Sequence, residues 1–98
     1  MNKKEFAIWA SALKTYYPKE KILPNAQALE LWYKQLQNIP YDIAEITLNE
    51  WVAKNVFSPS IAEILQNAEG VKVREKLQKL EDKALEGIGR HNLIEKGG

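Results

Sequence analysis

Hydrophobic and polar residues follow the period of an α-helix along most of the chain, and no segment shows the two-residue alternation of a β-strand. Prolines and capping residues divide the first 69 residues into four such segments, at about 3–17, 26–38, 41–55 and 60–70. The apolar stripes of these segments consist of Phe6, Trp9 and Leu13; Leu29, Trp32, Tyr33 and Leu36; Ala44, Leu48, Trp51 and Val52; and Ile61, Ile64, Leu65 and Ala68. The pattern therefore predicts an all-α fold, a small bundle of four helices.

Two helix starts carry the residues of a capping box. Asn2 is followed three residues later by Glu5, and Ser60 is followed three residues later by Glu63. In the second case Pro59 precedes the serine, and we expect it in the first turn of the helix, where proline is tolerated. Both signals fix the entry of the chain into a helix.

The C-terminal segment differs from the bundle in composition. Residues 70–98 contain no aromatic residue, whereas residues 1–57 contain all nine. On a background of charged residues, the apolar positions alternate by four, three and four residues: Val73, Leu77, Leu80 and Ala84. We therefore expect a bundle domain over 1–69, followed over 70–98 by an amphipathic helix that Gly87 and Gly89 break, or by a partly disordered tail.

Composition restricts the chemistry that the chain can perform. It has 98 residues, no cysteine and one histidine, His91, so thiolate metal sites and cysteine nucleophiles are excluded. No glycine precedes residue 70, which leaves no glycine-rich phosphate loop, and no 18-residue apolar run predicts a membrane helix. We expect no enzyme activity, no cofactor, no metal and no membrane partner.

A DNA-binding helix-turn-helix is one alternative interpretation of the third and fourth helices. The second of these would offer Gln66 and Asn67 to the bases but no lysine or arginine near its start. The net charge of +1 is also low for a nucleic-acid binder. A helix hairpin that packs into a core is therefore favoured, and no direct nucleic-acid partner is expected.

The aromatic residues are interpreted mainly as core. Trp9, Trp32 and Trp51 each lie on the apolar stripe of their own helix, so we expect all three to anchor the core. The tyrosines lie near helix ends and are expected to be partly exposed, as interface residues or as loop packing: Tyr16, Tyr17, Tyr33 and Tyr41.

Three motifs, taken in order, resemble the helicase loader and inhibitor family of phages that infect Gram-positive bacteria. They are the seven residues from Leu13 to Lys19, the group of Leu31, Trp32, Tyr33 and Leu36, and the ten residues from Asn55 to Ile64. The resemblance covers residues 5–68, about two-thirds of the chain. It implies a helical N-terminal domain and a less ordered C-terminal region that contacts a hexameric replicative helicase in its nucleotide-bound form.

The resemblance implies a non-enzymatic adaptor in the host bacterial cytoplasm. It would bind the replicative helicase, hold it inactive and deliver it to an initiator protein bound at the origin. The amphipathic C-terminal face is the surface that we expect to contact the helicase, with two flanking charges: Val73, Arg74, Lys76, Leu77, Leu80 and Ala84. The alternatives are a small helical DNA-binding regulator and a self-associating inhibitor of a host replication factor.

Overall fold

The computed structural model describes the backbone of residues 1–97 and the side chains of residues 1–85. It contains the helices α1 (Lys3–Tyr16), α2 (Ala26–Leu36), α3 (Tyr41–Lys54) and α4 (Ile61–Gly97), and residues 1–97 include no strand. The predicted all-α fold is therefore confirmed.

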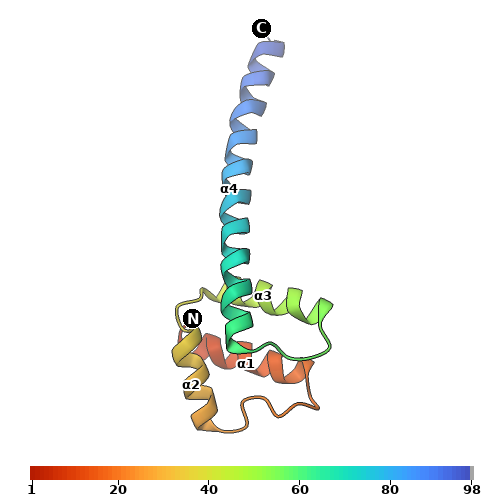
Figure 1. Ribbon diagram of the computed structural model, residues 1–98. Helices are drawn as coiled ribbons and strands as arrows, with labels where there is room; N and C mark the ends of the chain where they lie inside the picture. Colours follow the sequence, from red (N-terminus) through yellow and green to blue (C-terminus); the bar gives the residue numbers. More distant parts are fainter. Residues whose placement is uncertain (98) are drawn as a thin grey trace.

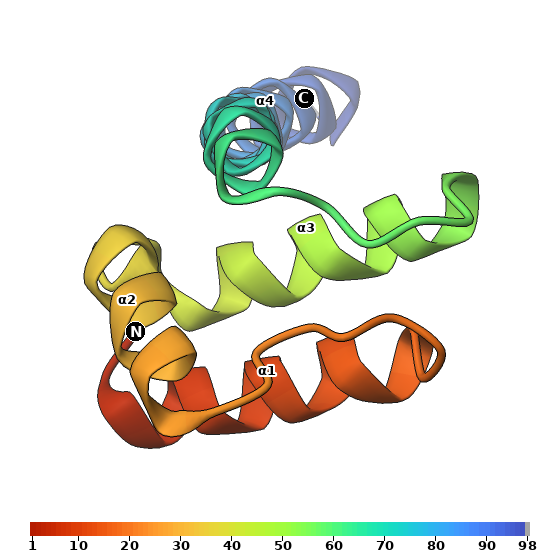
Figure 2. The same cartoon turned by 60° about the horizontal axis from the view of Figure 1, so that its bottom comes forward.

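The first three helices form a compact base from which the fourth projects (Figure 1). Helices α1 and α3 lie side by side and run in the same direction, while α2 crosses the end at which both begin (Figure 2). The first part of α4 rests on α3 and α2, and the rest continues away from the base. This projection gives the molecule a longest dimension of 66 Å, against 26 and 19 Å in the other two.

The core lies where the four helices meet. Leu13 of α1 and Leu36 of α2 are fully enclosed, and Ile64 of α4 is 2% exposed. Trp9 is also buried, and its indole Nε1 donates a hydrogen bond to the carbonyl oxygen of Ala44 at 3.0 Å. This bond satisfies the one polar group of the ring and ties α1 to α3.

The remaining aromatic residues divide between core and surface. Trp9 is a core anchor as predicted, but Trp32 and Trp51 are only partly buried against the core. Tyr17 was expected to be partly exposed, and that expectation is wrong, since only 7% of it is accessible. Tyr17 belongs to the core cluster, and its hydroxyl donates to the carbonyl oxygen of Asn55, 38 residues away, a contact that its position at a helix end does not reveal.

Both capping boxes are confirmed. The Asn2 side chain accepts from the Glu5 amide at 2.7 Å, and the Glu5 carboxylate accepts from the Asn2 amide at 2.8 Å. At the start of α4 the corresponding bonds between Ser60 and Glu63 measure 3.2 and 3.0 Å. Pro59 lies before the cap rather than in the first turn, because Ser60 itself is the capping residue and the helix begins at Ile61.

The structure corrects the predicted course of the C-terminal segment. The fourth helix does not give way to a separate helix after Gly70, and Gly87 and Gly89 do not break it: α4 is continuous from Ile61 to Gly97. A glycine inside a helix costs about 1 kcal/mol relative to alanine, a cost that weakens a helix without having to end it. The side chain of His91 lies outside the described residues.

Candidate partner-binding surfaces

One face of α4 attaches this helix to the base. Ile64, Ala68 and Val71 are spaced by four and three residues, and each is less than 5% exposed. They pack into the core formed with α3 and α2. The attachment ends at Val71, the last buried residue among those whose side chains are described.

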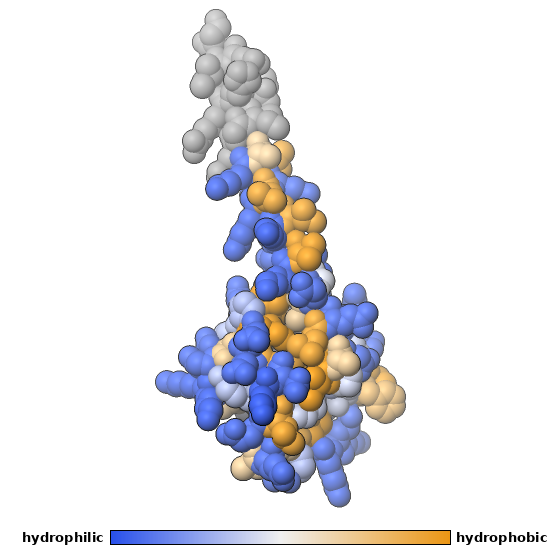
Figure 3. All heavy atoms as spheres, turned by 60° about the vertical axis from the view of Figure 1, so that its left-hand side comes forward, coloured by the Kyte–Doolittle hydropathy of each residue, from blue (hydrophilic) through white to orange (hydrophobic). Residues whose placement is uncertain are grey.

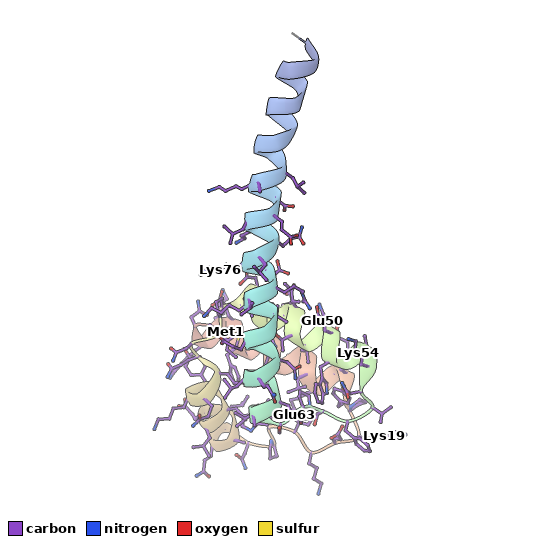
Figure 4. The ribbon with its side chains drawn as sticks, turned by 45° about the horizontal axis from the view of Figure 1, so that its top comes forward. Met1, Lys19, Glu50, Lys54, Glu63 and Lys76 are labelled. Carbon is purple, nitrogen blue, oxygen red and sulfur yellow. The ribbon has the colours of Figure 1, made fainter. Side chains whose placement is uncertain are left out.

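An ion pair lies just beyond the end of this attachment. Arg74 of α4 makes a two-pronged contact with Glu50 of α3: Nη1 lies 3.3 Å from Oε1, and Nη2 contacts Oε2. Both side chains are about half exposed, so the pair fixes orientation more than it adds stability. Figure 4 shows Glu50 on α3 beside α4, just below the level of Lys76.

The apolar stripe of α4 faces away from the attachment. An α-helix turns by about 100° per residue, so that with Val71 at zero the stripe of Val73, Leu77, Leu80 and Ala84 lies between about 180° and 240°. On the same scale the attached residues Ile64 and Ala68 lie at about 20° and 60°. The stripe is therefore on the opposite side of the helix from the core and does not continue it.

The stripe is accessible to a partner. Val73, Leu77 and Leu80 are 52%, 54% and 57% exposed, and Ala84 is exposed as well. Figure 3 shows hydrophobic side chains along one side of the projecting helix, between charged ones.

The two charged residues among the six predicted for the partner surface differ in their position. Lys76 is exposed beside the stripe, as a flanking charge would be. Arg74 points to the base and is engaged by Glu50, and sequence reasoning could not foresee this pairing across 24 residues. Leu85, 65% exposed, was not included in the predicted surface because it lies off the stripe.

A second exposed apolar feature lies in the loop between α3 and α4. Val56 is 82% exposed and Phe57 is 71% exposed. Sequence reasoning treated these residues only as part of a motif. The available signal was an adjacent pair of large apolar residues outside any helical stripe, directly before the Ser-Pro-Ser helix start.

The described residues have a further surface feature, a groove. A shallow groove of about 240 Å³ between α1 and α2 is lined mainly by apolar side chains such as Phe6 and Leu29, with the ion pair of Lys3 and Glu30 at its edge. Among residues 1–85, no group of three or more histidine, aspartate or glutamate side chains is placed to hold a metal ion. No helix in the part searched has the length and hydrophobicity to cross a membrane.

Comparison with known proteins gives one match. Residues 1–65 match the family model for the N-terminal domain of a phage helicase loader/inhibitor protein. The matched region contains all three motifs on which the family resemblance was based, and that resemblance is confirmed. No curated protein and no solved structure matches the chain.

Proposed function

Because this chain belongs to the family of phage helicase loader and inhibitor proteins, we propose that it is a non-enzymatic adaptor in phage DNA replication. It binds the hexameric replicative helicase in the host bacterial cytoplasm, holds it inactive and delivers it to the initiator protein at the origin. The observation that carries the proposal is the exposed stripe of α4, which is presented on the side of the helix opposite to the core.

The stripe supplies the contact with the helicase. Burying Val73, Leu77 and Leu80 would contribute about 1.5–3 kcal/mol each if they were fully exposed beforehand, and roughly half of that at their actual exposure. Lys76 adds a charge at the edge of the surface. Arg74 acts indirectly, because its pairing with Glu50 orients the stripe.

One stripe alone gives weak binding, since association has its own entropic cost. A partner with six equivalent sites can hold several chains, but each chain has a single stripe, so tighter binding needs a second contact from the base of the same chain. A contact of this size is also readily released, as delivery to an initiator requires.

The test is a titration of the chain into the replicative helicase of its own replication system, with and without ATP, followed by analytical ultracentrifugation. The double variant Leu77→Asp plus Leu80→Asp is compared with a matched control, Ile8→Asp plus Leu31→Asp, whose positions on the base are 53% and 56% exposed. We expect wild type and control to form a nucleotide-dependent complex near one chain per helicase subunit, and the stripe variant to form none.

Three results would contradict the proposal. The first is equal binding by the stripe variant, and the second is the absence of any complex with wild type. The third is a loss of thermal stability in the stripe variant, which would make the stripe part of the core. A concentration-dependent mass of the chain alone, abolished by the stripe variant, would instead favour the self-associating alternative.

A further inference from the structure

The loop between α3 and α4 presents two apolar side chains that the proposed helicase contact does not use. Val56 and Phe57 have larger exposed fractions than any other large hydrophobic residue in the described part of the chain. They are neighbours in sequence, and we call this exposed apolar pair the docking knob. Isolated exposed apolar residues are common on protein surfaces, but an adjacent pair on a rigid loop is a candidate interface anchor.

Hydrogen bonds from buried or half-buried aromatic side chains fix the backbone of the knob. The Tyr17 hydroxyl donates to the carbonyl oxygen of Asn55 at 2.8 Å, directly before the knob. The Trp51 indole Nε1 donates to the carbonyl oxygen of Phe57 itself at 2.7 Å. Both donors belong to the helical framework, at the end of α1 and in α3, so the loop is attached on both sides of Val56.

The residue that follows the knob is also held. Ser58 donates twice to the carboxylate of Glu20, from its amide to Oε2 and from its hydroxyl to Oε1, both at 3.0 Å. The next residue, Pro59, is buried, and Ser60 caps α4. The backbone from Asn55 to Ser60 is therefore set before any partner arrives, and binding costs little conformational entropy.

The surroundings of the knob are positively charged. Lys54 precedes it at the end of α3, and Lys19 and Lys21 flank Glu20, the residue that holds Ser58. All three lysines are exposed, and Figure 4 shows Lys19 and Lys54 at the same end of the base. The Glu20 carboxylate keeps its negative charge when it accepts from Ser58, so the three lysines and Glu20 together carry a net charge of +2 (three minus one).

We propose that the docking knob inserts into an apolar pocket bordered by carboxylates on a second protein, distinct from the partner of the stripe. An aromatic anchor with a charged rim is the usual composition of a protein interface, and the lysines would steer an acidic rim into place. A nucleic acid fits less well, because Val56 has no planar face to stack on a base and the whole chain carries a charge of only +1.

The knob and the stripe can be occupied at the same time. From Ile61, just after the knob, to Leu77 in the middle of the stripe the helix rises by about 24 Å. Both surfaces are fixed to one framework, since α4 is attached through Ile64, Ala68 and Val71. One chain can therefore hold two proteins at once, and this interpretation of the knob rests on the proposed adaptor function.

The experiment uses the purified initiator protein and the purified replicative helicase of the same replication system as separate probes. Wild type, Val56→Ser plus Phe57→Ser, and the control Ile8→Ser plus Leu31→Ser are titrated into each probe by sedimentation velocity. We expect the knob variant to bind the initiator at least about tenfold more weakly while its helicase affinity and melting temperature stay unchanged. Lys19→Gln plus Lys54→Gln should slow association with the initiator and reduce its salt dependence.

The proposal is overturned if the knob variant binds the initiator as tightly as wild type does, or if wild type does not bind the initiator. It is also overturned if only helicase binding weakens, or if Phe57→Ser abolishes a complex with single-stranded DNA. The helicase titration of wild type is independent of these outcomes. If wild type does not bind the helicase, the proposed function is wrong. The initiator titration would still show whether the docking knob binds a partner.

Discussion

Two truncations on the same helix test the opposite roles assigned to the two faces of α4. Ile64 is 2% exposed and lies in the core, whereas Leu77 is 54% exposed on the stripe. Replacing buried isoleucine by alanine leaves a cavity and costs about 2–5 kcal/mol, and Ile64→Val should cost only about 0.5–1.5 kcal/mol. Leu77→Ala removes a side chain that is already hydrated, and its effect should stay within about 0.5 kcal/mol.

Thermal unfolding followed by circular dichroism at 222 nm measures these differences. For a domain of this size each kcal/mol shifts the melting temperature by about 4–8 °C, so Ile64→Ala should lower it by at least about 8 °C. The melting temperature of Ile64→Val should lie between those of Ile64→Ala and wild type, and that of Leu77→Ala should match wild type. A large loss for Leu77→Ala would mean that the stripe packs on the base, and a small loss for Ile64→Ala would mean that α4 is not attached as described. Either result would refute the separation of the two faces.

Three further predictions concern single contacts. Ser60→Ala removes the cap of α4 and should lower the free energy of unfolding, measured by urea denaturation, by about 1 kcal/mol. Ser11→Ala, at an exposed position within α1, should have little effect. Arg74→Ala should cost at most about 1 kcal/mol, and the loss should shrink in high salt, because the pair with Glu50 is half exposed. Burial and the nearby carboxylate of Glu20 raise the pKa of Tyr17 above its usual value of 10.0. The neutral phenol of Tyr17 therefore stabilises the folded state fully below pH 10, and this contribution is lost as the pH rises through the higher pKa of the folded state. Phenylalanine has no group that ionises, so the urea midpoint of Tyr17→Phe should fall less steeply above pH 10 than that of wild type.

The helices of the base could be predicted because their signals are local. The capping boxes at Asn2 and Ser60 involve residues only three positions apart, and the apolar stripes reflect the helical period. The burial of Tyr17 could not be predicted in the same way, because this residue packs into the core and its hydroxyl reaches Asn55, 38 residues away. The pairing of Arg74 with Glu50 likewise depends on how α4 crosses α3.

The C-terminal segment was misjudged at its glycines for a physical reason. A glycine weakens a helix by a modest amount, and its effect depends on the residues on both sides. Gly70 lies between two segments that each have the helical period, and the helix passes through it. Treating the two segments as one helix would have predicted from sequence that the stripe faces away from the core. The adjacent apolar pair Val56 and Phe57 is visible in the sequence, but its fixed backbone could not be predicted, because it depends on bonds that Tyr17 and Trp51 donate and Glu20 accepts.

The continuity of α4 across Gly70 makes the direction of the stripe depend on residue count. Between the last attached residue, Val71, and the first stripe residue, Val73, lies only one position. Inserting one residue there would rotate everything beyond it by about 100° and lift it by about 1.5 Å, with no change in the composition of either surface. Inserting seven residues, close to two full turns, would restore the direction within about 20° and move the stripe about 10 Å farther from the base. Length changes in this short segment can therefore alter which way a bound partner faces while every contacting side chain stays the same.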